Sequence, residues 1–525
     1  MRPVLVCGAG PVGLVTALLL AQWGVPCTVL EAAPGPDVSG SRAICLQRDV
    51  LEVFDRIGCA APMLAEGVTW SVGHTFYRDH ELFTTTFPDP GGSPLPPWIN
   101  LSQCSTERYL LDAVEASPLV DLRFDHRVVA LTQNRAGVEV EVATGGGRRL
   151  CAAQAAQVVA ADGARSALRR MVGVRFPGHS FADQFLIADV RADLPFPSER
   201  RFHFDPEWNP GRQVLVHEQP DSVWRIDWQV PADFDLAAER ASGALDARIR
   251  RIVGERPYEI VWLSVYRFHE RVADEFRLGR VFLVGDAAHL FAPFGARGLN
   301  SGVQDAENLA WKLAAIHHGW VSGHDAERLL DSYSQERRPA ALENLRVTNA
   351  TMHFLVPPDE AARARRRQLL KRAVHDADAR RLIDSGKLAE PYWYLDSPLT
   401  TPYPAAAHFP TAPGIPRPPV PGVLCPDAPC QVPERPGVTR LRQLFGAGFV
   451  VLAARGWFSL PGTGIPATGY ALPAIDPAGV VRQMLHAAAD SVHLVRPDGH
   501  LAAVLPHLDD AALVAALRRA CGQHH

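Results

Sequence analysis

Several features that define other classes of protein are missing from this sequence. The formal net charge is only −4 over 525 residues, so no basic surface for nucleic acid is expected. No apolar run is long enough to cross a bilayer and no signal peptide is evident, which predicts a cytoplasmic protein without a membrane segment. The nine cysteines form no CxxC pair, which argues against a disulfide framework, thiol exchange or a metal site.

What is present is the composition of a globular protein, 47% hydrophobic and 21% charged. The chain is too long for one core, so roughly two to four domains are expected. Strand–turn–helix patterns occur near the N-terminus, around Asp162 and around Gly285, which predicts an α/β fold. Residues 180–268 instead alternate in polarity, and "RQVLVHEQ" and "VWRIDWQV" are joined by Pro220-Asp221-Ser222 as in a hairpin.

The first glycine-rich turn is Gly8-Ala9-Gly10-Pro11-Val12-Gly13, between the apolar strand "PVLVC" and a helix. Its first glycine suits a tight turn, its second lets the backbone approach a pyrophosphate, and its third allows close helix–strand packing. Glu31 ends the next strand, 18 residues after Gly13, where a carboxylate can bind the adenosine ribose. The motif predicts a dinucleotide site without deciding between NAD and FAD.

A second glycine-rich stretch, "VGDAAHLFAPFGARGLNSGVQDAENLAWKL", begins at Val284. Asp286 follows a buried strand, where a carboxylate needs polar partners, and the ribityl hydroxyls of a flavin would supply them. We expect the following helix to begin near Asn300, so that the amides of Leu299 and Asn300 face the electron-rich edge of the flavin ring. Asp305 is then expected in the first turn, where an acid suits the helix dipole, and simple helix support and a functional role are equally open for it.

A third strand-to-helix turn begins at Asp162-Gly163. Together the three turns resemble those of the single-component FAD-dependent aromatic hydroxylases related to para-hydroxybenzoate hydroxylase, over roughly residues 1–350. "VHLVRPDGHLAAVL" near the C-terminus is similar to the thioredoxin-like extension of the phenol and hydroxyphenylpropionate hydroxylase branch. Because that extension has no CxxC here, a packing or dimer role is expected for it.

The resemblance implies a Rossmann-like FAD-binding domain with an inserted antiparallel-sheet substrate domain. The expected boundaries are 1–72, 101–178 and 269–353 for the FAD-binding domain, 73–100 and 179–268 for the substrate domain, 354–400 for a helical linker, and 401–525 for the thioredoxin-like domain. A homodimer is considered as the assembly.

The resemblance also implies site residues. Arg42 and Gln103 would lie along the pyrophosphate and ribityl chain, and Asp162 would serve FAD, NAD(P)H or both. The full expected cofactor-binding set is Gly8, Gly10, Pro11, Val12, Gly13, Glu31, Ala32, Arg42, Gln103, Asp162, Gly163, Gly285, Asp286, Pro293, Gly295, Gly298, Leu299 and Asn300.

The chemistry of the family is hydroxylation of an activated aromatic ring with NAD(P)H and O2, through a flavin C4a-hydroperoxide. The substrate would be a small phenolic acid or a larger polyketide-type aromatic, bound between the inserted sheet and the 293–298 loop. Candidate catalytic residues are His217, Tyr266 and Pro293, with His217 as a base or an ordinary histidine. Trp224 and Trp228 would contact the substrate or form the core of the sheet.

Three alternatives remain open at this point. "WRIDWQVP" invites comparison with the flavin halogenases, but its tryptophan spacing differs from theirs. Halogenases also need a lysine in the N-terminal part, whereas lysine occurs only at positions 312, 371 and 387. A flavin-dependent reductase and a non-catalytic binding protein share the scaffold, and the intact 285–302 segment argues against the second.

Overall fold

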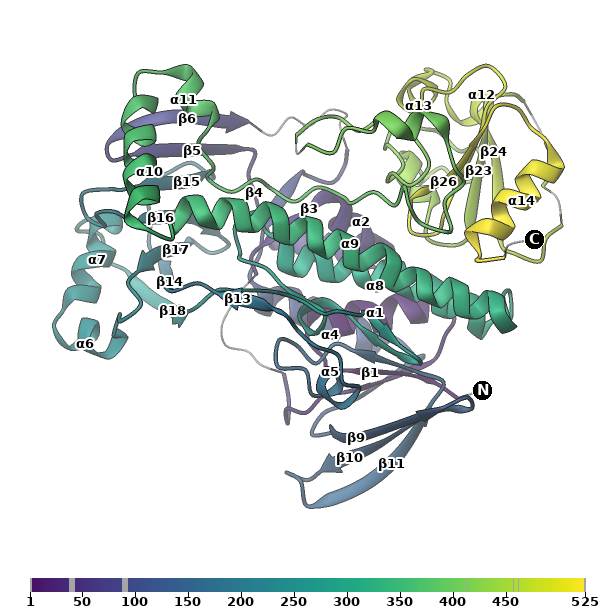
Figure 1. The fold of residues 1–525 in the computed structure, drawn as a ribbon, viewed down its shortest axis with the longest axis horizontal. Helices are drawn as coiled ribbons and strands as arrows, with labels where there is room; N and C mark the ends of the chain where they lie inside the picture. The colour runs from purple at the N-terminus through teal and green to yellow at the C-terminus, as the bar shows by residue number, and fades with distance from the viewer. Residues whose placement is uncertain are drawn as a thin grey trace.

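The computed structural model describes residues 2–36, 43–86, 93–412, 414–456, 458–460 and 462–523. Its central layer is a six-stranded sheet with the order β20-β21-β12-β1-β2-β8 (Figure 1). Its strands are β1 (Val4–Cys7), β2 (Cys27–Leu30), β8 (Val120–Arg123), β12 (Gln157–Ala160), β20 (Arg277–Leu278) and β21 (Val281–Leu283). Neighbours pair in parallel except β20 and β21. Strands β1 and β12 are buried throughout, as continuous apolar runs in parallel sheets are.

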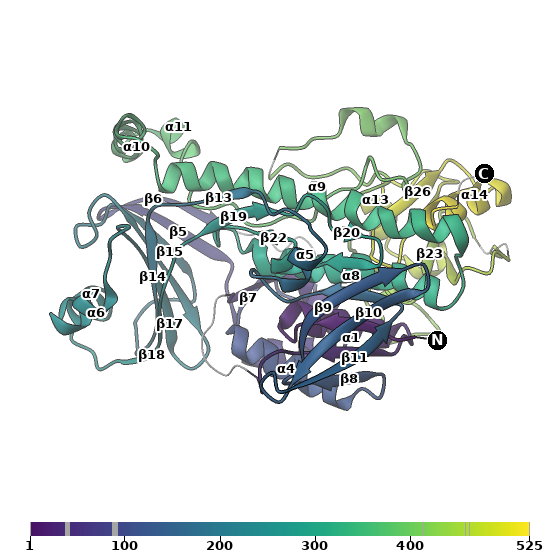
Figure 2. The same cartoon turned by 60° about the horizontal axis from the view of Figure 1, so that its bottom comes forward.

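The N-terminal helix packs beside two consecutive helices from the middle of the chain. Helix α1 (Pro11–Gln22) contacts α8 (Arg297–His317), and α8 contacts the long helix α9 (Gly323–Leu355) (Figures 1 and 2). This arrangement sets the glycine-rich start of α1 beside the glycine-rich start of α8. Within the described ranges, no helix combines the length and apolar content that crossing a bilayer requires.

Smaller elements complete this first part of the molecule. Helix α4 (Gln103–Ala116) packs on α1. Helices α2 (Arg48–Arg56) and α3 (Ala60–Glu66) contact each other, and α2 also contacts α8. Three small sheets accompany these helices: β9 (Arg127–Asn134), β10 (Gly137–Thr144) and β11 (Arg149–Ala155) form the first, β3 (Cys45–Gln47), β4 (Val68–Thr69) and β7 (Trp98–Asn100) the second, and β13 (Gly178–Ser180), β19 (His269–Val272) and β22 (His289–Leu290) the third. Helix α5 (Ala167–Met171) follows β12.

A second, seven-stranded sheet lies beside the first and has the order β18-β14-β17-β16-β15-β5-β6. Its strands are β5 (Val72–Tyr77), β6 (His80–Thr86), β14 (Gln184–Arg191), β15 (Arg200–Phe204), β16 (Gln213–Gln219), β17 (Val223–Val230) and β18 (Glu259–Tyr266). All neighbours are antiparallel except β15 and β5. One face packs on α7 (Ala244–Val253), next to α6 (Leu236–Ala241). The other contacts Phe294 and the end of α9.

The C-terminal part contains a four-stranded sheet in the order β24-β23-β25-β26, coloured yellow-green to yellow in Figure 1. Its elements are β23 (Phe449–Ala453), β24 (Ala467–Ala471), β25 (Val492–Val495), β26 (Leu501–Leu505) and the helices α12 (Leu472–Ile475), α13 (Val480–Met484) and α14 (Asp510–Ala520). Apolar residues of β23 and β25 share a core with Trp311 and Ala315 of α8. The C-terminal sheet therefore packs directly on the helical layer.

The expected α/β class with an inserted antiparallel sheet is confirmed. The hairpin at Pro220–Ser222 is also confirmed, because Asp221 and Ser222 both have positive φ, as the tight turn between two antiparallel strands requires. Helices α10 (Glu360–Ala373) and α11 (Ala377–Arg381) occupy only part of the expected linker. The four domain boundaries and the thioredoxin-like character of the last part stay predictions.

Candidate active site

A cavity of about 390 Å³ lies where the seven-stranded sheet meets the ends of the six-stranded sheet, and Ala161 and Val284, which directly follow β12 and β21, line it. The glycine-rich start of α1 contributes Gly10, Pro11 and Val12, and the start of α8 contributes Gly298 and Leu299. The seven-stranded sheet supplies a further wall, which contains Phe185, Ile187, Arg200, Leu215, His217, Arg225, Asp227, Trp262, Ser264 and Tyr266. Segments separated by more than 250 residues in the sequence thus meet at one site.

The three glycines of the first turn occupy three different environments. A Cβ on Gly8, whose φ is +109°, would lie 2.3 Å from the carbonyl oxygen of Ala161. A Cβ on Gly13 would lie 2.0 Å from the carbonyl oxygen of Gly8, so the helix could not approach the strand with any side chain there. A Cβ on Gly10 would meet nothing within 4 Å and would project into open space beside the cavity. This is the geometry that the dinucleotide fingerprint requires.

The second glycine-rich stretch is held against the first by small residues. A Cβ on Gly302 would lie 2.5 Å from Val12 Cγ2, and one on Gly285 would lie 3.1 Å from the same atom. Val12 therefore fits between Gly285 and Gly302. Asp286, the next residue, is exposed on the cavity while its neighbours are buried. Its carboxylate is positioned to accept hydrogen bonds from a ligand's hydroxyl groups.

Two predicted carboxylates have backbone partners instead of lining the cavity. Glu31 accepts hydrogen bonds from the backbone N–H groups of Ala9 (2.8 Å) and Ala33 (2.7 Å), so it fixes the glycine-rich turn. Asp162 accepts from Ala167 N (2.7 Å) and Leu168 N (3.1 Å), at the start of α5. Its Oδ1 atom is buried without a hydrogen bond among the described residues. Ala32 lies beside Glu31 and outside the cavity lining.

The start of α8 differs from the expectation. The helix begins at Arg297, not near Asn300, because Ala296 takes a left-handed conformation (φ 55°) and begins the helix one turn earlier. The side chain of Asn300 is buried and donates to the backbone oxygen of Cys45 (3.0 Å), so it ties α8 to β3. Leu299 and Gly298 line the cavity and Asn300 does not.

Asp305 is correspondingly not in the first helical turn, so its expected placement there is wrong. It is fully buried and accepts from the backbone N–H of Gly285 (3.1 Å), from His289 Nε2 (2.6 Å) and from Arg337 Nε (2.7 Å). Burial would raise the pKa of this carboxyl, but the charges of His289 and Arg337 outweigh it and hold the pKa below its usual value. Asp305 therefore fixes the Gly285–Asp286 turn from behind.

The structure does not bring Trp224 and Trp228 to the cavity, which corrects their placement as substrate contacts. Both are buried on the opposite face of β17, in a cluster with Leu245 and Ile249 of α7. Alternation along a strand shows which residues share a face but not which face meets the ligand. Their position agrees with the alternative interpretation, that Trp224 and Trp228 form the core of the sheet.

The cavity face of β17 carries charged residues that the sequence analysis missed. Arg225 donates from Nε and Nη2 to the two oxygens of Asp189 on β14, both at 2.8 Å, and this pair is buried. Asp227 lies two residues further along the same face, beside Ile187 of β14 and Leu215 of β16. Polar residues alternating with Trp224 and Trp228 in a strand buried on both faces were the signal that could have identified them.

Each of the three predicted catalytic residues, His217, Tyr266 and Pro293, lines the cavity. His217 is buried next to Arg225 in the sheet register, and its Nδ1 has no hydrogen bond among the described residues. Burial, together with the charges of Arg200 and Arg225, lowers the pKa of His217 well below 6.5, so the ring is neutral at neutral pH. A neutral imidazole of this kind is a weak base.

The remaining predicted cofactor residues divide by position. Gln103, Gly163 and Gly295 line the cavity, and Gln103 Oε1 accepts from the backbone N–H of Ala43 (3.3 Å). Gly8, Gly13 and Gly285 support the lining from behind, as their close contacts show. Arg42 lies outside the described residues.

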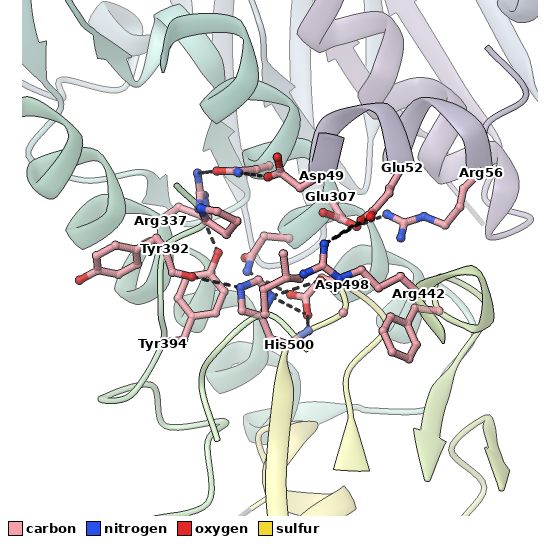
Figure 3. A pocket seen from close by; sticks show the side chains of 16 residues that line it. Asp49, Glu52, Arg56, Glu307, Arg337, Tyr392, Tyr394, Arg442, Asp498 and His500 are labelled. Carbon is pink, nitrogen blue, oxygen red and sulfur yellow. Dashed lines mark hydrogen bonds and ion pairs between the residues drawn. The ribbon is translucent and has the colours of Figure 1, made fainter. Parts of the chain in front are cut away.

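A second cavity, of about 30 Å³, lies between α2, α8, α9 and the C-terminal part (Figure 3). Its walls are strongly charged. Arg442 donates to Glu52 of α2 (3.1 and 3.3 Å), and Arg56 pairs with Glu307 of α8. Arg337 donates from Nη1 to the hydroxyl of Tyr394 (2.9 Å). This cavity lies where the C-terminal part contacts α2, α8 and α9, and it is not a continuation of the larger cavity.

Buried ion pairs extend from this cavity into α9. Arg496 of the C-terminal part donates from Nη2 to Glu336 of α9 (2.9 Å) and from Nε to Asp498 (3.0 Å). Lys312 of α8 donates to the same Glu336 carboxylate (2.7 Å). Arg337, the next residue of α9, binds Asp305. Two consecutive side chains of one helix therefore connect the C-terminal part with the Gly285–Asp286 turn.

The residues present fit an FAD molecule. Gly10 and Gly298 leave space in which a Cβ would project without contact, and helices α1 and α8 both begin at the cavity, where free N–H groups suit phosphate and electron-rich ring edges. Asp286 offers an exposed acceptor between them. The start of α1 therefore suits a pyrophosphate, Asp286 suits a polyol, and the start of α8 suits a flavin ring.

Comparison with known proteins also indicates an FAD-binding protein. Residues 1–348 match the family model described as "FAD binding domain". A flavin-dependent monooxygenase of Mycobacteroides abscessus is 35% identical over 373 residues, which are 67% of this chain and 74% of that protein. Para-nitrophenol 4-monooxygenase of Pseudomonas sp. (strain WBC-3) is 32% identical over 400 residues, 73% of this chain and 95% of that one. The crystal structure of the flavin-dependent monooxygenase PieE with FAD and substrate shares the fold, with a TM-score of 0.83, 24% identity and coverage of 100% and 99%.

Proposed function

Because the chain belongs to the FAD-binding domain family, we propose that it is an FAD-dependent monooxygenase that hydroxylates an aromatic substrate in the cavity between its two sheets. NAD(P)H is the reductant and O2 the oxidant, and one oxygen atom enters the product while the other leaves as water. The observation that carries this function is the single cavity that joins the start of α1, the start of α8 and the charged face of the seven-stranded sheet.

Bound FAD supplies hydride acceptance and oxygen activation, and the protein supplies position and environment. Gly10 would let the backbone approach the pyrophosphate, while Glu31 holds the turn in shape. Asp286 would bind hydroxyls of the ribityl chain. The N–H groups at the start of α8, around Gly298 and Leu299, would stabilise negative charge on the flavin ring.

The substrate lies against the seven-stranded sheet. The apolar wall of the cavity suits a flat aromatic ring, and comprises Phe185, Ile187, Leu215 and Trp262 of this sheet with Phe268 and Phe294 from outside it. The polar groups Arg200, Arg225 and Asp227 on the same wall suit a ring that carries hydroxyl or acidic substituents. A phenolic compound is the class that this combination favours, and a polyketide-type aromatic is its larger form. Tyr266 and Pro293 shape the same space.

We infer transient docking for NAD(P)H, since no second glycine-rich β–α–β unit is evident in the sequence. The cytoplasm is the compartment we propose, because the nicotinamide is supplied there and the cysteines of the described residues form no disulfide bond. A homodimer stays a prediction that light scattering on the purified protein would test.

The test of the function is an isotope experiment. Purified protein supplied with FAD should consume NAD(P)H faster when a phenolic compound is added, and 18O from labelled O2 should appear in the product hydroxyl. Peroxide is measured at the same time to detect uncoupled oxidation. Product without label would favour a reductase on the same fold, and protein that binds no FAD would favour a non-catalytic binding protein.

A further inference from the structure

We propose that Asp227 is the base that accepts the hydroxyl proton of the phenolic substrate, an inference that rests on the hydroxylase function proposed above. Asp227 was not among the residues predicted from the sequence. The inference starts from its position in the cavity wall and from the missing partner of one of its oxygens.

Asp227 lies in the middle of the seven-stranded sheet, on the face that lines the cavity. In the sheet register its neighbours are Ile187 on one side and Leu215 on the other, both apolar and both in the cavity wall. Its Oδ1 atom is buried and makes no hydrogen bond within the described part of the chain. A carboxylate oxygen in that state is costly unless a partner arrives with the ligand.

The charged and titratable groups around Asp227 come from every strand beside it. Arg225 lies two residues away on the same face of β17, and Asp189 of β14 holds the Arg225 guanidinium in place. His217 of β16 pairs with Arg225 in the register. Arg200 of β15 lines the same wall, as does Tyr266 of β18.

The balance of these groups suits proton transfer. Burial raises the pKa of Asp227 to about 7, with the Arg225 charge opposing the rise and Asp189 adding to it. A general base is most effective when its pKa lies near the working pH, because it is then ionised and still basic enough to take a proton. His217 lacks this match, since its pKa is well below 6.5.

The step itself is a proton transfer. The O–H bond of the phenol breaks, an O–H bond forms on the carboxylate of Asp227, and the negative charge moves to the phenolate oxygen. Arg225 and Arg200 lie on the wall that receives this charge. A phenolate donates more electron density to its ring than a phenol does, so the carbon atoms ortho and para to the oxygen become better nucleophiles. After oxygen transfer the proton returns to the product or leaves to solvent.

The test is Asp227→Asn, which keeps the shape and removes the base. With phenol as the probe at neutral pH, kcat/KM for hydroxylation should fall by roughly 10²–10⁴-fold. Because burial raises the pKa of Asp227 to about 7, the wild-type rate with phenol should fall below about pH 7, and this fall should be absent in the variant. With para-nitrophenol at mildly alkaline pH, where this phenol is already ionised, the variant should stay within a few-fold of wild type. Asp233→Asn, the same change at an exposed position just after β17, is the matched control.

A second readout does not depend on turnover. Infrared difference spectra of the FAD-loaded protein, recorded with and without phenol above pH 7, should show a protonated carboxyl group that appears on phenol binding. The band should be absent in Asp227→Asn and present in Asp233→Asn. It reports the proton on the side chain directly.

The outcomes separate the two proposals. Equal loss with phenol and para-nitrophenol, or no loss with either, would overturn the role of Asp227 as base while leaving the hydroxylase function in place. A wild-type enzyme that oxidises NAD(P)H with neither compound would count against the function instead. In that case the infrared band still decides whether Asp227 takes the proton, and its absence would overturn the inference.

Discussion

Removing the charge of Arg496 should release the C-terminal part from the rest of the molecule. The guanidinium is fully buried and is shared between Glu336 of α9 and Asp498, whose side chains are 0% and 2% exposed. In Arg496→Met the shape is roughly kept, but two buried carboxylates lose their main cation. Breaking a buried pair by removing one partner typically costs about 3–5 kcal/mol.

The lower end of that range is expected here. Lys312 still donates to Glu336 (2.7 Å), and Trp311 Nε1 still donates to Asp498 (3.2 Å). Against this, Arg496 also loses its contacts over the rings of Trp311 (5.4 Å) and Tyr394 (5.3 Å), each worth about 0.5–2 kcal/mol. Since the two ring contacts add to the loss of the ion pair, we expect the free energy of the first unfolding transition to fall by roughly 4 kcal/mol.

The measurement is urea denaturation followed by circular dichroism, with limited proteolysis to show which part opens first. Arg455→Met is the matched control, because Arg455 pairs with Asp490 at the surface of the same part, with side chains 77% and 41% exposed. Exposed pairs contribute less than about 1 kcal/mol. If the two variants lose the same free energy, the buried ion pairs do not hold the C-terminal part in place.

Three further predictions concern the cofactor, the sheet and pH. Gly10→Val should weaken FAD binding by about 1–3 kcal/mol, which is about 5- to 160-fold in Kd, since its side chain enters the cavity. Gly35→Val, equally unobstructed, is the control, and FAD titration followed by flavin fluorescence measures both. Trp228→Ala should lower the free energy of unfolding by about 3–5 kcal/mol and leave KM for the aromatic substrate unchanged; a raised KM in the folded protein would contradict its position behind the sheet. Burial would raise the pKa of Glu336, but Arg496 and Lys312 hold it well below 4.5. The stability that this pairing gives should therefore be complete above pH 4.5 and decrease as the pH falls further. Melting temperatures that stay constant as the pH falls below 4.5 would contradict this prediction.

The sequence predicted the parts of this protein that local pattern determines. Three strand-to-helix turns and one hairpin follow from the spacing of glycines, prolines and apolar residues, and the convergence of the turns follows from the parallel sheet that they end. Which side of the inserted sheet faces the cavity did not follow, because alternation is symmetric between faces. For this reason Trp224 and Trp228 were predicted to face the cavity, whereas Arg225 and Asp227 face it in the structure.

The ion pairs were beyond reach for a different reason. Glu336 and Arg496 are 160 residues apart, and nothing in either local segment indicates the other. Asp305 was expected in the first turn of its helix because the helix was expected to begin near Asn300. The helix begins at Arg297 instead, and the Asp305 side chain accepts a hydrogen bond from the backbone of Gly285.

Glu336 and Arg337 also bear on how this chain can be cut or recombined. A truncated form that ends after α9 would keep a carboxylate evolved to meet a guanidinium from the far end of the polypeptide, and would leave it facing water or an empty space. Exchanging the last part between relatives would require the matching face of α8 and α9 to travel with it. The catalytic half and its C-terminal companion should therefore be inherited, expressed and engineered as one unit.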